Sequence, residues 1–292
     1  MYKMVVIDID GTLLTSQGKI TDKTKEALVK AQEQGMIVVL ASGRIANSTI
    51  NYARNIGLNS YAISGNGSVI TDIQSEEMIY TNCMSNRVTQ LIVDICKENS
   101  ISFNVYTLNE ILTEKIEYNI LFYSMQNREL VEEKKTKINI CDDLSRAIKE
   151  KADNNVSKIT ICDKDESIFK SIIRKLRTIN GIEILDVSHS SHKVIDVGSQ
   201  KVDVDYYYTE VSKANVDKWN AIKFLADKLE INYEDVICIG DNANDIKMIE
   251  NCGLGVFLDN AAPVYKEKAK YVAPSNDDDG IVDVLEKYVF NK

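Results

Sequence analysis

The two ends of the chain alternate short apolar runs with amphipathic helical patterns, and this alternation most constrains the fold. Lys3–Ile9, Met36–Ala41 and Val236–Ile239 are runs typical of strands buried on both faces. Helical patterns over residues 21–35 and Ala46–Ile56 follow the first two runs. Repeated units of this kind predict an α/β fold, a doubly wound parallel sheet with helices on both faces. Further core strands are expected at Ser60–Ile63, Gly255–Leu258 and Tyr271–Ala273, and helices at Asp217–Leu229, Ala243–Asn251, Ala261–Lys268 and Asp279–Tyr288.

The middle of the chain, residues 82–212, differs from the two ends. Its strand-like stretches alternate apolar and polar residues as half-buried strands do. These features predict an α+β domain inserted into a core that residues 1–81 and 213–292 form together. Strands are expected at Lys158–Ile161 and His192–Val197 and helices at Arg87–Glu98 and Ser167–Thr178, while the local structure of Asn109–Lys151 stays open.

Length and composition bound the class of protein. A chain of 292 residues suits two domains, and six scattered cysteines without a C-x-x-C pair favour reduced thiols over a zinc site. The formal net charge of −9 argues against a nucleic-acid partner, because such a surface needs a basic patch. No apolar run approaches the roughly 20 residues of a membrane span, and no secretion signal opens the chain. We therefore expect a cytoplasmic protein without a membrane partner, as a monomer or weak homodimer.

Two carboxylates, Asp8 and Asp10, follow the first predicted strand in the run DIDGT. Ligands of open α/β sheets bind at the carboxyl ends of the strands. Paired carboxylates there suit Mg²⁺, which prefers oxygen ligands. The alternative is a calcium loop of the D-x-D-G type, which needs a glutamate near its twelfth position. This chain has Lys19 there, so the sequence argues against calcium.

A second polar cluster, GDNAND at residues 240–245, follows another predicted strand. Taken alone, Asp241 and Asn244 are equally well explained as helix caps. The two clusters are expected at the same edge of the sheet, because carboxyl ends of parallel strands meet there. Together they favour a metal site.

Phosphate-binding candidates occur at two predicted helix starts. Ser42, Gly43 and Arg44 lie where a strand gives way to a helix, and free backbone N–H groups at such a place bind anions. A lone serine there is more often a helix cap, and Arg44 either braces the loop or contacts ligand. Lys218 opens the helix Asp217–Leu229, and Lys213 is the alternative for the same role.

In order and spacing, the stretches DIDGTLL, ASGR, KWNAI and GDNANDIKM resemble the haloacid dehalogenase superfamily of phosphatases. The similarity extends to the Cof-like branch with a large α/β cap of type IIB, with Ser64–Gly67 and Asp259–Ala261 as further matching stretches. The resemblance implies a magnesium-dependent phosphoric monoester hydrolase that acts on a small phosphorylated metabolite, such as a sugar phosphate or a cofactor-precursor phosphate.

The resemblance also implies a role for each matching residue. Asp8 would be the nucleophile and a metal ligand, and Asp10 the general acid and base, with its backbone carbonyl on the metal. Asp241 would complete the protein ligands, with Asp245 in support, through water or from outside the ligand sphere. The phosphoryl group would be held by Thr12, Ser42, Gly43, Lys218 and Asn244, with Thr12 also orienting the first loop.

Two departures from the family pattern concern Trp219, where glycine commonly follows the lysine, and Asp259, where glycine is usual. The tryptophan raises the hypothesis of a narrower substrate entrance. A phosphomutase on the same scaffold, or a phospho-acceptor or binding module without enzymatic activity, is the alternative function. Asp10 argues against a phospho-acceptor domain, which lacks this acid and base.

Other conspicuous residues have simpler interpretations. His189 and His192 form an H-x-x-H pattern without a third ligand, which favours a polar loop over a metal site. The run Tyr206–Tyr208 is expected to pack at the hinge between the domains, since neighbouring strand residues face opposite sides. The acidic run Asn276–Asp279 is expected to cap the last helix.

Overall fold

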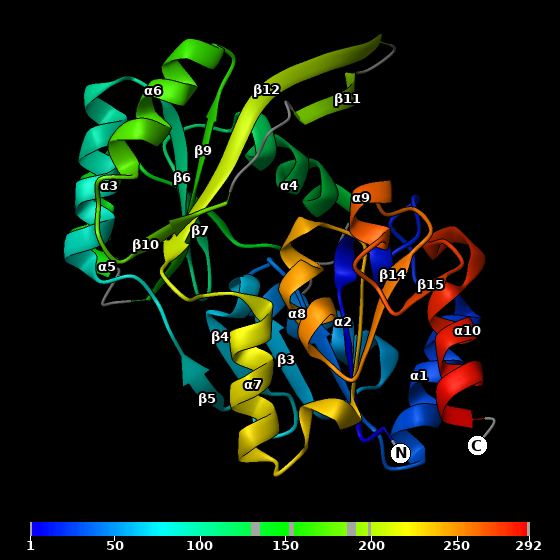
Figure 1. The fold of residues 1–292 in the computed structure, drawn as a ribbon. Helices are drawn as coiled ribbons and strands as arrows, with labels where there is room; N and C mark the ends of the chain where they lie inside the picture. The colour runs from blue at the N-terminus through cyan, green and yellow to red at the C-terminus, as the bar shows by residue number, and fades with distance from the viewer. Residues whose placement is uncertain (1, 130–134, 152–154, 186–190, 198–199, 291–292) are drawn as a thin grey trace. The chain divides into compact units, whose positions relative to one another are not determined.

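The computed structural model describes residues 2–129, 135–151, 155–185, 191–197 and 200–290 (Figure 1). The chain divides into a core unit, Met1–Thr81 with Val216–Lys292, and an inserted unit, Asn82–Asn215. The predicted boundary after residue 212 falls earlier than this one, because the last strand of the inserted unit continues to Lys213.

The sheet of the core unit has the strand order β15-β14-β13-β1-β2-β3-β4-β5. Neighbours are parallel from β15 to β3, as predicted, and their residues are almost entirely buried. The edge formed by β4 and β5 is antiparallel, which the sequence analysis missed. The strands are β1 Met4–Ile7, β2 Ile37–Ala41, β3 Tyr61–Ser64, β4 Val69–Asp72, β5 Met78–Thr81, β13 Val236–Gly240, β14 Leu254–Leu258 and β15 Tyr271–Ala273.

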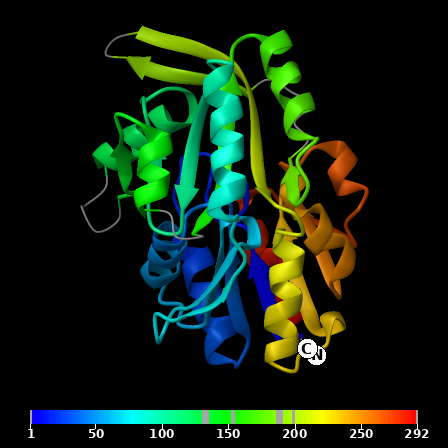
Figure 2. The ribbon, with the colours of Figure 1, turned by 90° about the vertical axis from the view of Figure 1, so that its left-hand side faces the viewer.

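Helices cover both faces of this sheet (Figures 1 and 2). The apolar sides of α1 (Asp22–Glu33), α2 (Ala46–Ile56) and α10 (Gly280–Leu285) form one core cluster with the strands. Those of α7 (Lys218–Lys228) and α8 (Ile246–Asn251) form the second. The short helix α9 spans Pro263–Lys266, and a turn over Glu286–Phe290 follows α10.

Local signals set the helix ends where the sequence predicted them. The side chain of Thr21 accepts a hydrogen bond from the Thr24 amide and so caps α1. The side chain of Asp217 caps α7 through the Asn220 amide. Residues 243–251 were predicted as one helix, but a 3-10 turn, Ala243–Asp245, precedes α8.

The inserted unit has its own sheet, in the order β10-β12-β9-β6-β7-β8, with β11 paired to β12. Alternate residues of its strands join α3, α5 and α6 in an apolar cluster, while α4 lies on the other side of the sheet (Figure 1). The helices are α3 Asn86–Glu98, α4 Tyr118–Glu129, α5 Leu144–Lys151 and α6 Glu166–Leu176. The strands are β6 Ser102–Thr107, β7 Ile111–Thr113, β8 Ile138–Ile140, β9 Val156–Asp163, β10 Ile182–Ile184, β11 Ser191–Val197 and β12 Gln200–Lys213.

The three consecutive tyrosines alternate across β12. The Tyr206 ring packs on Tyr118, with centroids 5.1 Å apart, and the Tyr207 ring packs on Phe169 at 5.8 Å. The alternation follows the expected geometry of a strand. The predicted position at the hinge is wrong, because these residues pair with β11 and β9 inside the inserted unit.

No helix in the described part of the chain is long and apolar enough to cross a membrane.

Candidate active site

The loop after β1 lies against the loop after β13. These strands are parallel neighbours, with Ile7 beside Ile239, so the residues that follow them meet at one edge of the sheet. Gly11 has a φ of +83°, and a Cβ atom there would lie 2.3 Å from Oδ2 of Asp241. Only glycine allows this approach without displacing the carboxylate. The Thr12 hydroxyl donates to Oδ1 of Asp241 at 3.0 Å, which ties the two loops together.

Lys218 connects Asp8 with Asp245. Its side chain is fully buried, and Nζ donates to Asp8 and, at 2.7 Å, to Oδ1 of Asp245. The start of α7 sits close to the turn after β3, since a Cβ atom on Gly67 would lie 2.2 Å from the carbonyl oxygen of Asp217. Lys213 is exposed at the end of β12. Of the two lysines that the sequence left open, Lys218 is the one beside Asp8.

Three carboxylates form a cluster with the chemistry of a cation site. Oxygen atoms of Asp8, Asp241 and Asp245 lie within 4.8 Å of one another. Burial raises the pKa of Asp241 to about 7, and the charge of Asp245 adds to this effect. Burial raises the pKa of Asp8 well above its ordinary value, although the charge of Lys218 opposes it. The charged forms of these crowded, buried carboxylates are disfavoured without a cation. Their oxygen atoms are ligands that fit Mg²⁺.

Asp245 has a more direct place in the site than the sequence suggested. Its Oδ2 accepts hydrogen bonds from the amides of Asp241 and Asn242, at 3.0 and 3.1 Å, and its Oδ1 accepts from Lys218. The carboxylate therefore fixes the conformation of the loop after β13 and contributes an oxygen atom to the cluster. Its side chain has no exposed surface.

Asp10 lies outside the carboxylate cluster. Its two oxygen atoms accept hydrogen bonds from Nε and Nη2 of Arg44, at 2.8 and 2.6 Å. The sequence left open whether Arg44 braces the loop or contacts ligand, and in the structure its guanidinium group holds Asp10.

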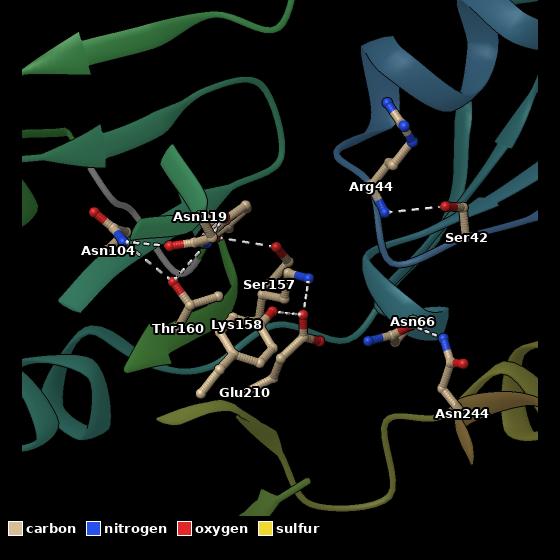
Figure 3. A network of polar contacts seen from close by, with 12 residues as sticks. Ser42, Arg44, Asn66, Asn104, Asn119, Ser157, Lys158, Thr160, Glu210 and Asn244 are labelled. Atoms are coloured by element: carbon tan, nitrogen blue, oxygen red, sulfur yellow. Dashed lines mark hydrogen bonds and ion pairs between the residues drawn. The ribbon is translucent and has the colours of Figure 1, made fainter. Parts of the chain in front are cut away.

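Two backbone hydrogen bonds, both donated by the loop after β3, join it to the loop after β2. The Asn66 amide donates to the Ser42 carbonyl at 2.9 Å, and the Gly65 amide donates to the Arg44 carbonyl at 2.8 Å. The Ser42 hydroxyl accepts from the Arg44 amide at 3.2 Å, and Asn244 donates to the Asn66 side chain at 3.1 Å (Figure 3). Asn66, which the sequence analysis assigned no role, thus connects the Ser42 loop to Asn244. The sequence signal that could have indicated this role was an asparagine between two glycines directly after a predicted strand.

A second brace that the sequence analysis missed supports the loop of Asp8. The side chain of Asn260 donates to the Gly11 carbonyl at 2.8 Å and accepts from the Asn276 amide at 3.2 Å. The Asn276 side chain in turn donates to the Leu14 carbonyl at 2.7 Å. Two asparagines far from this loop in the sequence therefore hold its middle, at Gly11, and its end, at Leu14.

The two departures from the family pattern have local explanations. Trp219 is buried in the second core cluster, with its ring 5.3 Å from that of Tyr233, so it packs inside the core unit. The hypothesis that it narrows a substrate entrance is therefore wrong. Asp259 is exposed, and its side chain pairs with Lys266 at 2.7 Å.

The acidic run before α10 acts differently from its predicted role. Asp279 occupies the N-cap position but makes no side-chain cap hydrogen bond. Its carboxylate accepts hydrogen bonds from Thr21 and Thr24 of α1 instead, at 2.5 and 3.4 Å. Of the two histidines, His189 lies outside the described residues, and the side chain of His192 is not described either.

A family model of haloacid dehalogenase-like hydrolases matches residues 5–285, and the chain belongs to this family. The 5-amino-6-(5-phospho-D-ribitylamino)uracil phosphatase YcsE of Bacillus subtilis is 25% identical over 287 residues, which cover 98% of this chain and 96% of that protein. A haloacid dehalogenase-like hydrolase from Bacteroides thetaiotaomicron has a similar solved structure, with a TM-score of 0.77, 27% identity and coverage of 98% and 99%. The structure of a subclass IIB sugar phosphatase gives a TM-score of 0.73 at 20% identity over 98% of each chain, which shows a shared fold. These findings confirm the predicted family, fold class and enzyme class.

Proposed function

We propose that this protein hydrolyses the phosphate monoester of a small metabolite through a phospho-aspartate at Asp8. The observation that carries the proposal is the buried contact of Lys218 with Asp8 and Asp245. A carboxylate is a poor nucleophile towards a phosphate group, because both are negative. A buried ammonium group beside Asp8 reduces that repulsion.

Asp8 and Asp10 divide the chemistry between them. An oxygen of Asp8 attacks the phosphorus atom, the bond to the leaving oxygen breaks, and Asp10 gives that oxygen a proton. A water molecule then attacks the phosphorus atom and gives its proton to Asp10. The bond between phosphorus and Asp8 breaks, which releases phosphate and restores the Asp8 carboxylate and the protonated Asp10.

Other residues of the site hold the transferring group. Thr12, Ser42, Gly43, Lys218 and Asn244 are proposed to bind the phosphoryl oxygens, a role that depends on positioning and charge neutralisation. Support comes from the hydrogen bonds that fix the Ser42 loop and Asn244 through Asn66. Because Thr12 already donates to Asp241, we assign it the orientation of its loop as well.

Mg²⁺ is the proposed cofactor, since the carboxylate cluster offers it hard oxygen ligands. Asp8 and Asp241 would bind it directly, Asp10 through its backbone carbonyl, and Asp245 directly or through water. The bound cation would neutralise charge on the carboxylate and phosphoryl oxygens.

The inserted unit is proposed to select the substrate. It has its own sheet and its own apolar core, so its side chains can vary without disturbing the residues around Asp8. The names of relatives suggest two substrate classes, a phosphoribitylamino-uracil and a sugar phosphate. We propose a phosphorylated polyol or sugar, in line with these two names, as the substrate class.

A panel of phosphate esters tests the proposal. Purified protein with Mg²⁺ should release inorganic phosphate from at least one ester, and Asp8→Asn should reduce turnover by a factor on the order of 10³ or more. Asp22→Asn is the matched control, because this exposed aspartate of α1 loses the same charge. Retention of more than a few per cent of turnover by Asp8→Asn would contradict the role of Asp8. Conversion of an ester to its isomer without phosphate release would identify a phosphomutase instead.

A further inference from the structure

Asp10 and Arg44 form an ion pair with very unequal exposure. The Asp10 side chain is 56% exposed, whereas the Arg44 side chain is 8% exposed. Both nitrogen–oxygen contacts are short, which is the geometry of a two-point hydrogen-bonded pair. A partly exposed carboxylate is therefore held at both of its oxygen atoms by a buried guanidinium group.

Two residues of α2 fix that cation. The Ser48 hydroxyl lies 3.4 Å from Nη1 of Arg44, and the guanidinium carbon lies 5.2 Å from the centre of the Tyr52 ring. Ser48 and Tyr52 are four residues apart on α2, so they lie on one face of the helix. The Arg44 backbone is held as well, through the Ser42 hydroxyl and the Gly65 amide.

We propose that Arg44, fixed by Ser48 and Tyr52, is a positioning residue that holds the Asp10 carboxylate in the orientation needed for proton transfer. The inference rests on the proposed function and deepens it. Arg44 donates to one oxygen of Asp10 through Nε and to the other through Nη2, and this two-point contact fixes the plane of the carboxylate.

The two parallel N–H donors of the Arg44 guanidinium group are essential for this role. A lysine at position 44 would supply a point charge without the two parallel donors that fix the plane of the carboxylate. Proton transfer depends on the distance and direction of the carboxylate, and a displacement of about 1 Å can reduce a rate by a factor on the order of 100. The alternatives are that Arg44 binds the substrate itself or only stabilises its loop.

A double-mutant cycle separates these possibilities. Arg44→Ala should lower kcat for an alkyl phosphate by a factor on the order of 10 to 100, with KM within about twofold. In an Asp10→Asn background, the same substitution should lower kcat by less than about twofold. The residue that Arg44 positions no longer transfers a proton there. The loss should be smaller for p-nitrophenyl phosphate, whose leaving group departs without protonation.

Three further variants keep the inference testable if Arg44→Ala is unstable. Arg44→Lys should show most of the loss in kcat, Tyr52→Leu a loss of a few fold, and Tyr52→Phe none, since it keeps the ring. Crystal structures of the Arg44 variants should show Asp10 in a different rotamer, a result that does not depend on activity.

Several results would overturn the inference while leaving the phosphatase function intact. One is an equal loss of kcat on Arg44→Ala in the wild-type and Asp10→Asn backgrounds, and another is full activity of Arg44→Lys. The others are an Arg44→Ala variant that changes only KM, and an Asp10 rotamer that stays the same in the Arg44 variants. Two other results would instead contradict the proposed phosphatase function. The wild-type protein would release no phosphate, or Asp8→Asn would still release it.

Discussion

The ammonium group of Lys218 lies 2.7 Å from the carboxylate of Asp245, and neither side chain has exposed surface. The pair joins the start of α7 to the loop after β13. Two buried charges are costly unless each is paired and hydrogen-bonded. Here Asp245 also accepts two backbone amides, and Lys218 also contacts Asp8, so the pair is part of a larger network.

We expect Lys218→Ala to abolish phosphatase activity and to destabilise the protein by about 3 kcal/mol, because it leaves buried carboxylates without their cation. Enzyme assays and urea unfolding measure the two effects. Lys213→Ala is the matched control, and it should change neither, because that lysine is exposed. The reverse pattern, with activity lost only in Lys213→Ala, would mean that the wrong lysine has been assigned.

Gly11→Ala should cost both stability and activity. Alanine would have to adopt a φ of +83°, and its Cβ would meet the Asp241 carboxylate at 2.3 Å. We expect kcat to fall by a factor on the order of 100. Gly18→Ala is the control, since its φ is +73° and nothing lies within 4 Å of the added Cβ. It should lose about 1 kcal/mol of stability and keep full activity. Equal activity of the two variants would refute the importance of this contact.

The metal-free protein should become less stable as the pH rises from about 4 to about 7. Burial raises the pKa of Asp241 to about 7, so in this range the folded protein binds more protons than the unfolded chain. The free energy of unfolding therefore falls with pH across this window, by an amount on the order of 2 kcal/mol. Urea unfolding with a chelator at pH 5 and pH 8 measures it.

Asp241→Asn should reduce this pH dependence and stabilise the metal-free protein at pH 8, while the raised pKa of Asp8 keeps part of it. Added Mg²⁺ should stabilise the wild-type protein at pH 8 more than at pH 5, because binding requires ionised carboxylates. A wild-type protein that gains stability between pH 5 and pH 8 without metal would contradict the raised pKa of Asp241.

A buried ion pair in the inserted unit offers a fourth test. Lys158 and Glu210 are 6% and 12% exposed and lie 2.5 Å apart (Figure 3). Lys158→Ala should destabilise the unit by about 3 to 5 kcal/mol, since Glu210 would remain buried without its cation. The double substitution Lys158→Met with Glu210→Leu should lower the free energy of unfolding less than Lys158→Met or Glu210→Leu alone, as measured by urea unfolding. Additive costs would show that the two charges do not stabilise each other.

The sequence by itself indicated the core strands, most helix ends and the positions of Asp8, Asp10 and Asp241, whereas the structure decided between Lys218 and Lys213. These features depend on local patterns: apolar runs of strand length, Thr21 and Asp217 as caps, and carboxylates directly after strands. The antiparallel edge formed by β4 and β5 escaped prediction, although its strands are as long as β1 and β3, because the direction of a strand depends on its neighbours in the sheet. The described residues of the stretch Asn109–Lys151 form four elements, but its sequence lacks a clear period, which kept its structure open.

Only the tertiary structure decided which polar side chains pair with which. Arg44 faces Asp10, Asn66 faces Asn244, and Asn260 holds Gly11 although 249 positions separate them in the sequence. Such contacts depend on how loops from different strands meet at one edge of the sheet, and no local pattern encodes that geometry. The sequence could name the residues that we propose to carry the chemistry, because local patterns place them directly after strands. Their orientation depends on long-range hydrogen bonds, which form only when the core packs.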